Sequence, residues 1–141
     1  MAVLTLTQVI PQPVAHVFDT VADGGHFAEW NPTVRSSRQL TDGPIGAGTR
    51  FEWDLRGFGR VVQELAEFEQ NRRVRIVPHI ASLKGGHRFT FTSVPDGTRV
   101  DHELEMVPQG AFRLMGPLTS MIGRRNLRAT AAALEKRLAG P

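Results

Sequence analysis

The sequence predicts an α+β fold in which a meandering sheet is covered by one long C-terminal helix. Residues 3–10 are apolar and β-branched, and two short helical segments follow them before Trp30-Asn31-Pro32. Residues 33–107 then form strand-like segments separated by turns, and residues 112–138 have helical spacing. This order can leave a gap between the sheet and the long helix, where we expect the functional site.

Length and composition indicate a single domain, 1–141, of ordinary globular character. Hydrophobic residues make up 40% of the 141 positions and charged residues 22%. The absence of cysteine excludes disulfides, thiolate catalysis and thiolate metal sites. Without a signal-peptide pattern or a run of about 18 apolar residues, we expect a cytoplasmic protein and no membrane insertion.

The net charge of +3 raises the question of nucleic-acid binding. Arginines cluster only at Arg72-Arg73-Arg75 and at Arg124-Arg125-Arg128. An RNA-binding sheet needs aromatic and basic side chains on one face, whereas here the strand aromatics alternate with charges and fall on the opposite face. We therefore expect no nucleic-acid partner.

Turn residues and prolines delimit the two short helices. Apolar residues recur at helical spacing from residue 14 to 21, between Pro11-Gln12-Pro13 and Asp23-Gly24-Gly25. A second short segment, 26–29, follows, and it cannot continue as a helix past Pro32.

Alternating hydrophobicity defines the strands of the meander. The clearest case places Phe51, Trp53 and Leu55 on one face, with charged residues between them. The alternation changes phase within residues 60–68, which predicts a β-bulge, and Pro78 predicts an edge strand or a frayed strand end. The strands expected after the short helices are 33–40, 49–56, 60–68, 74–80, 87–94 and 99–107.

The long helix, 112–138, carries two apolar stripes that do not share one face. The first stripe consists of Met115, Leu118 and Ile122. The second consists of Leu127, Ala131, Leu134 and Leu138. Gly123 lies where the stripe changes and predicts a kink or break. We expect the second half to pack on the sheet and the flexible first half to cover an opening.

Several short segments, taken together, resemble one known family. They are Val9-Ile10-Pro11 with Val17-Phe18 and Val21-Ala22-Asp23, Trp30-Asn31-Pro32, Gly46-Ala47-Gly48-Thr49-Arg50-Phe51, Gly97-Thr98-Arg99-Val100, and Leu134-Glu135 with Leu138. In this order they resemble the polyketide cyclase/dehydrase-like group of the START-like superfamily, related to the birch-pollen allergen. The resemblance implies a helix-grip fold, a seven-stranded antiparallel sheet around the long helix, and a deep cavity for an apolar ligand. It implies no shared catalytic motif.

Among the histidines, His102 and His87 are the candidates for chemistry. His102 shares its strand parity with Val100 and Leu104, which predicts that it points inward and stays neutral near pH 7, able to act as acid or base. His87 shares its parity with Phe89 and can face the same space. The alternative is that both rings are structural, with their nitrogens satisfied by hydrogen bonds.

Other chemistries lack their sequence patterns. No histidine–carboxylate cluster has metal-ligand spacing, so we expect no metal and no other cofactor. Gly85-Gly86 and Gly57-Phe58-Gly59 are interpreted as turns, because neither opens a helix after a strand as a phosphate loop requires. No nucleophile elbow is present.

The expected ligand site is an apolar interior with a few polar groups. Its predicted lining residues are Phe51, Trp53, Leu55, His87, Phe89, Phe91, His102, Leu104, Met106, Met115, Leu118 and Ile122. Ser93 and Thr119 are further candidates for polar contacts.

Three hypotheses follow for function. The first is binding or carriage of a small hydrophobic or aromatic molecule, polyketide-like or lipid-like, by a monomer or homodimer. The second is cyclisation or dehydration of a polyketide intermediate, with His102 moving a proton. The third is an interaction module that binds another protein or RNA through Arg124, Arg125 and Arg128, with a steep salt dependence.

Overall fold

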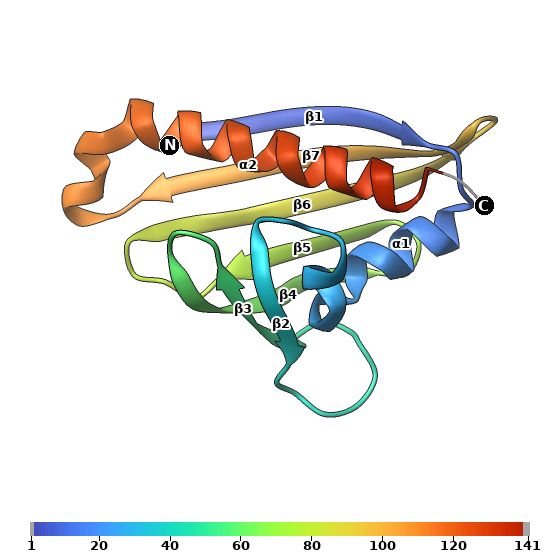
Figure 1. Ribbon diagram of the computed structural model, residues 1–141, viewed down its shortest axis with the longest axis horizontal. Helices are drawn as coiled ribbons and strands as arrows, with labels where there is room; N and C mark the ends of the chain where they lie inside the picture. Colours follow the sequence, from blue (N-terminus) through green and yellow to red (C-terminus); the bar gives the residue numbers. More distant parts are fainter. Residues whose placement is uncertain (1, 140–141) are drawn as a thin grey trace.

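The computed structural model describes residues 2–139, which form an open seven-stranded sheet with helices on one side (Figure 1). Every neighbouring pair of strands is antiparallel, in the order β1-β7-β6-β5-β4-β3-β2. The strands are β1 (Ala2–Ile10), β2 (Val34–Gln39), β3 (Arg50–Leu55), β4 (Gly59–Glu69), β5 (Arg73–Pro78), β6 (Leu83–Val94) and β7 (Gly97–Pro108). The seven-stranded antiparallel sheet expected from the family resemblance is confirmed.

The helices are α1 (Val14–Ala22), η1 (Gly24–Glu29), η2 (Gly110–Met115) and α2 (Gly116–Arg137). In Figure 1, α2 runs along β1 and β7, and it contacts these two strands. The short helix α1 packs against β5, β6 and β7, while η1 packs against β2 and β3. The helical layer therefore covers the sheet unevenly.

Asn31, in the segment Trp30-Asn31-Pro32, ties the end of η1 to α2. Its side chain is buried, and its Nδ2 donates a hydrogen bond to Oγ1 of Thr130 at 3.1 Å. Its Oδ1 accepts hydrogen bonds from the backbone N–H and the hydroxyl of Thr33. The segment thus fixes the start of β2 relative to the long helix.

Two details of the strands confirm the sequence analysis, and one corrects it. The predicted bulge lies in β4, between Leu65 and Glu67, and Pro78 is the last residue of β5. Gly85-Gly86, however, lies inside β6 and is not a turn. Gly85 has φ +116°, and a Cβ there would collide with the carbonyl oxygen of Glu105, so glycine allows the two strands to approach closely.

The long helix also differs from its prediction. Residues 112–115 belong to the 3-10 helix η2, and α2 begins only at Gly116, with Pro117 in its first turn. The helix continues through Gly123 without a break. A Cβ at Gly123 would collide with Cε of Met106, so this glycine allows α2 to lie close to β7.

One end of the inner face of the sheet is tightly packed. Phe18 of α1 makes edge-to-face contacts with Phe68 and Phe91 at centroid distances of 5.4 and 5.3 Å. The fully buried residues of this core include Ile10, Val17, Val21, Phe51, Leu65, Val74, Phe89, Val100 and Leu134. They are covered by α1, η1 and the C-terminal half of α2.

The other end of the same face is less covered. Leu4 and Leu6 in β1, His87 in β6 and Leu104 in β7 share the inward parity of the buried residues, yet each is only half-buried. These residues lie toward the first half of α2, away from α1. Side chains that face the helical layer therefore remain partly accessible at this end.

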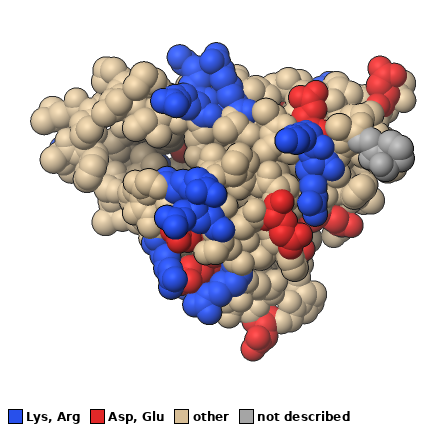
Figure 2. All heavy atoms as spheres, viewed as in Figure 1, with Lys and Arg blue, Asp and Glu red and all other residues tan. Residues whose placement is uncertain are grey.

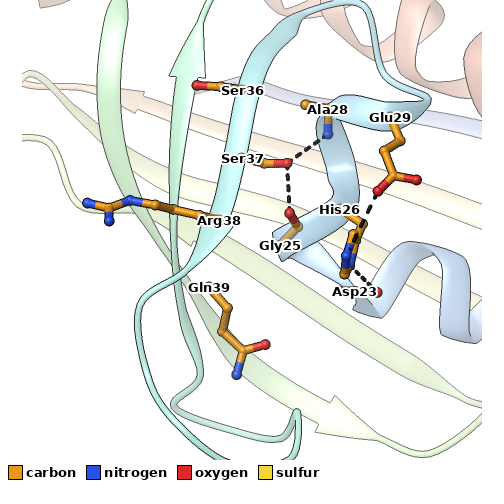
Figure 3. Close-up of a pocket in the computed structure, with 9 residues that line it drawn as sticks. All are labelled: Asp23, Gly25, His26, Ala28, Glu29, Ser36, Ser37, Arg38 and Gln39. Atoms are coloured by element: carbon orange, nitrogen blue, oxygen red, sulfur yellow. Dashed lines mark hydrogen bonds and ion pairs between the residues drawn. The ribbon is translucent and has the colours of Figure 1, made fainter.

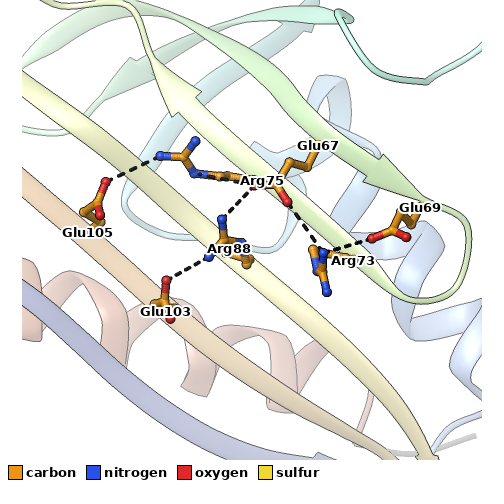
Figure 4. Close-up of polar contacts among 7 residues, drawn as sticks. All are labelled: Glu67, Glu69, Arg73, Arg75, Arg88, Glu103 and Glu105. Carbon is orange, nitrogen blue, oxygen red and sulfur yellow. Dashed lines mark hydrogen bonds and ion pairs between the residues drawn. The ribbon is translucent and has the colours of Figure 1, made fainter.

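The outer face of the sheet carries ion pairs instead of a helix. Arg88 donates to Glu67 at 2.8 Å and to Glu103 at 2.9 Å, as Figure 4 shows. The hydrogen bond from Arg88 lowers the pKa of Glu67. Arg73 and Arg75 extend the network across β4 to β7. As predicted from the alternation, the charges lie opposite the inward-facing rings.

Candidate functional site

Two histidines on neighbouring strands are hydrogen-bonded to each other on the inner face. The register pairs Phe89 with His102 and His87 with Leu104, so the two imidazoles lie diagonally across β6 and β7. Nε2 of His87 lies 3.0 Å from Nδ1 of His102. The His87 ring also stacks on Phe89, with centroids 3.9 Å apart and planes 11° apart. These contacts fix the position of both rings.

Gln8 of β1 determines which ring nitrogens carry protons. Its Nε2 donates to the carbonyl of Ala131 in α2 at 3.0 Å, so its Oε1 is the atom that faces His102. Nε2 of His102 must therefore donate to Gln8, at 2.6 Å, and its Nδ1 must accept from His87. This assignment leaves Nδ1 of neutral His87 with a free lone pair, and no hydrogen bond to it exists among residues 2–139.

Burial keeps both imidazoles neutral at physiological pH. His102 is only 1% exposed, and the loss of solvation lowers its pKa from 6.5 to about 4. The pKa of His87 is lowered well below 6.5, first by burial and then by the neighbouring His102. His102, predicted to point inward, does so, but both of its nitrogens are engaged.

Gln63 is a polar group on this face that the sequence analysis missed. It lies in β4 with the inward parity of Val61 and Leu65 and is only 5% exposed. The register places it between Phe51 of β3 and Pro78 of β5. No hydrogen bond of its carboxamide is found within the described part of the chain. The signal available in the sequence was its parity with two apolar neighbours.

Aromatic residues predicted to line a cavity instead form the packed core. Trp53 stacks on Phe27 of η1 at 4.3 Å, and its Nε1 donates to the carbonyl of Gly24 at 2.8 Å. Phe51 packs so closely on Gly24 that a Cβ there would lie 2.5 Å from the ring, and Phe91 contacts Phe18. The structure brings these rings together with α1 and η1.

The remaining predicted residues fall into two groups. Leu55 and Leu104 are half-buried on the inner face, Phe89 lies beneath His87, and Met106 packs under Gly123. Met115, Leu118 and Ile122 lie at the surface of the molecule, with Ile122 57% exposed. The side of α2 that faces the sheet carries Gly123 and Leu127 instead.

Two open hollows lie elsewhere, on either side of η1. The first, of about 560 Å³, is lined by η1 and β2, as Figure 3 shows. There, Oγ of Ser37 accepts from the N–H of Ala28 at 2.9 Å and donates to the carbonyl of Gly25 at 3.0 Å. The hydroxyl of Ser37 thus fastens η1 to β2.

The second hollow, of about 500 Å³, lies among α1, η1 and the end of α2. Two pairs of its side chains are in contact: Asp23 hydrogen-bonds to His26 at 2.7 Å, and Glu29 pairs with Arg137 at 3.5 Å. Neither hollow is lined by His87, His102 or Gln63.

Residues 2–139 lack two kinds of feature that would point to other functions. This part of the chain has no group of three or more His, Asp or Glu side chains placed to hold a metal ion. It also has no helix long and apolar enough to cross a membrane. The inner face of the sheet carries apolar side chains, the two imidazoles and the carboxamide of Gln63.

Comparison with solved structures identifies proteins that share this fold. A protein from Thermus thermophilus, TTHA0849, aligns with a TM-score of 0.81 and 21% identity over 98% of this chain and 97% of that one. A START superfamily protein from Mycobacterium smegmatis aligns with a TM-score of 0.72 and 17% identity over 97% of each chain. Ara h 8.0201 aligns with a TM-score of 0.73 and 14% identity over 98% and 97%.

A further structural neighbour is the di-domain ARO/CYC protein BexL of the BE-7585A biosynthetic pathway. It aligns with a TM-score of 0.78 and 21% identity over 99% of this chain and 50% of BexL. These likenesses confirm the predicted helix-grip fold.

Sequence comparison identifies a family. Among curated proteins none matches the sequence. Residues 1–139, nearly the whole chain, match the family described as polyketide cyclase / dehydrase and lipid transport. The protein therefore belongs to the polyketide cyclase/dehydrase and lipid transport family.

Proposed function

We propose that the protein binds and carries a small hydrophobic or aromatic molecule between the sheet and the first half of α2. The observation that carries the proposal is the half-burial of Leu6, Leu104 and His87, which face the helical layer without being covered by it. Figure 2 shows the surface hollowed between the start of α2 and the body of the molecule. A ligand there would remove apolar surface from water at about 25 cal/mol per Å².

Two polar groups would orient the ligand. Nδ1 of His87 offers a lone pair, and the carboxamide of Gln63 offers both a donor and an acceptor without a partner in the described chain. A mostly apolar ligand with a hydroxyl or phenol group would match this set. The family description and the ARO/CYC neighbour support a polyketide-like or lipid-like molecule.

Native mass spectrometry of the freshly purified protein tests the proposal together with titration of anilinonaphthalene sulfonate. We expect a co-purified molecule, or stoichiometric dye binding that apolar competitors displace. Leu104→Trp should fill the space and weaken binding about tenfold or more, because the indole takes the place of ligand. Leu118→Trp, on the outer side of α2, is the matched control and should bind normally. Absence of any stoichiometric ligand would exclude the proposal.

The second candidate function is cyclisation or dehydration of a polyketide-like substrate, and the hydrogen-bonded histidines favour it. The sequence predicts His102 as the residue that moves a proton. Because Gln8 and His87 occupy both nitrogens of His102, we propose that Nδ1 of His87 accepts the proton and that His102 positions it. Protonated His87 would keep its Nε2–H bond to His102.

Assays with a poly-β-ketone substrate distinguish these roles. His87→Ala should abolish turnover, whereas His102→Asn, whose carboxamide can still accept from His87, should retain part of it. Gln63→Ala should change the KM more than kcat. Equal activity of His87→Ala and the wild type would remove the enzymatic candidate and leave ligand carriage untouched.

A further inference from the structure

The projecting segment that joins the sheet to α2 exposes an unusual amount of apolar surface. Within residues 112–122, six large apolar side chains are exposed: Phe112, Leu114, Met115, Leu118, Met121 and Ile122. Leu114 is 89% exposed, the most of any large hydrophobic residue described. In Figure 2 this end of the molecule is an almost uncharged protrusion. Scattered apolar residues need no explanation, but a contiguous group indicates an interaction surface.

Helical geometry places part of this group on one outer stripe. Leu118, Met121 and Ile122 are spaced i, i+3 and i+4, so they share a face, and Gly123 and Leu127 occupy the opposite, sheet-packed face. The next turn continues the exposed side with Arg125. The surface therefore passes directly from apolar to cationic.

The charged residues of this surface are all basic. Residues 106–134 contain Arg113, Arg124, Arg125 and Arg128 and no acidic residue. None of these arginines pairs with an acidic side chain among residues 2–139, although those on the sheet, such as Arg88, mostly do. Figure 2 shows basic side chains over the middle of α2, next to the uncharged protrusion. The expected partner is therefore anionic.

We propose that residues 112–128 dock on an anionic lipid surface, with the apolar protrusion in the interfacial layer and the arginines at the headgroups. An exposed apolar stripe flanked by arginine is the pattern of interfacial helices. A second copy of this chain fits less well, because it would bring two sets of unpaired arginines together. A bilayer can also accommodate a convex protrusion without a preformed groove, whereas a protein partner would need a groove of matching shape. The docking is peripheral and requires no bound ligand, so it is independent of the proposed carriage.

Flotation with vesicles of phosphatidylcholine, alone or in an equimolar mixture with phosphatidylglycerol, tests the proposal. We expect the protein to float with the mixed vesicles only, and less as salt rises. The triple variant Arg124→Gln, Arg125→Gln, Arg128→Gln should lose on the order of a hundredfold in partition coefficient, or roughly fivefold per arginine. Leu118→Gln with Ile122→Gln should lose about tenfold to a hundredfold.

The matched control removes three exposed arginines elsewhere, Arg35→Gln, Arg60→Gln and Arg72→Gln, and should float nearly as the wild type does. If the α2 variants fail to fold, Leu114→Gln in η2 replaces them, since its side chain is almost wholly exposed. Failure of the wild type to float, or equal losses in the control, would overturn the proposal. So would sedimentation showing a dimer that the Leu118→Gln, Ile122→Gln variant dissociates.

Discussion

Nε2 of His87 donates a hydrogen bond to Nδ1 of His102 across β6 and β7, and Gln8 completes the chain by accepting from the other nitrogen of His102. The three residues come from three adjacent strands of the sheet. The chain ends on the carbonyl of Ala131, so it also connects the sheet to α2. Together, His87, His102, Gln8 and the carbonyl of Ala131 fix the tautomers of the two imidazoles on an otherwise apolar face.

Because both imidazoles are held neutral, stability should depend on pH. The pKa of His102 falls to about 4 and that of His87 falls well below 6.5, whereas in the unfolded chain both histidines titrate near 6.5. Between pH 6.5 and 5 the unfolded state thus binds protons that the folded state does not. The free energy of unfolding should decrease as pH falls, by about 1.4 kcal/mol per pH unit for each histidine. Urea unfolding at several pH values measures this slope.

Replacing both histidines by glutamine should remove most of that pH dependence. A wild-type stability that is constant from pH 6.5 to 5 would mean that the rings take up protons in the folded protein as readily as in the unfolded chain.

Substituting Gln8→Leu should destabilise the protein by about 1–3 kcal/mol. The change leaves the Nε2–H of His102 buried without an acceptor, and that group cannot reach water. Thr5→Val, on the exposed side of the same strand, is the control and should change stability by less than about 0.5 kcal/mol. Chemical denaturation compares the two. A Gln8→Leu protein as stable as the control would argue against the hydrogen-bonded chain.

The close approach of α2 to β7 predicts that Gly123→Ala is destabilising, by about 1–3 kcal/mol, although alanine favours helices. The new methyl would overlap Cε of Met106. Met106→Ala should relieve the overlap, so a double-mutant cycle should give a coupling energy of at least about 0.5 kcal/mol. Gly116→Ala, where a Cβ meets no atom within 4 Å, is the matched control. Additive effects would show that the helix can move away.

A second glycine contact predicts a larger effect. A Cβ on Gly24 would lie 2.5 Å from the ring of Phe51, which is fully buried. Gly24→Ala should therefore cost about 2 kcal/mol or more and lower the thermal midpoint by several degrees. Gly46→Ala, with no atom within 4 Å of the new methyl, should be nearly neutral. Calorimetry of the two variants would contradict this packing if they melted together.

Most of the fold was predictable because apolar and polar residues alternate along much of the sheet. Phe51 and Trp53 of β3 face inward and their charged neighbours face outward, and the phase change in β4 correctly predicted the bulge at Leu65. The extent of β6 was missed because Gly85 looks like a turn residue. Glycine is needed at this position because the backbone of β6 lies close to the carbonyl oxygen of Glu105. No local sequence pattern reveals that contact.

The site was predictable only in part. The parity of His102 indicated its inward direction, but its partner Gln8 is 94 positions away and is brought to it by the pairing of β1 with β7. The orientation of α2 was misjudged because its outer stripe, with Leu118, is more apolar than the glycine-containing side that touches the sheet. The spacing of apolar residues identifies one face of a helix, but it does not show whether that face packs on the sheet or points to solvent.

The uneven packing of the inner face has a consequence for how this protein can diversify. The side chains that secure folding cluster with Phe18 beneath α1, while those proposed to meet a ligand, such as Leu104 and His87, sit at the opposite end. Most of the residues proposed to contact a ligand thus lie outside the packed core. New specificities can arise by substitution at the open end while the scaffold keeps its stability.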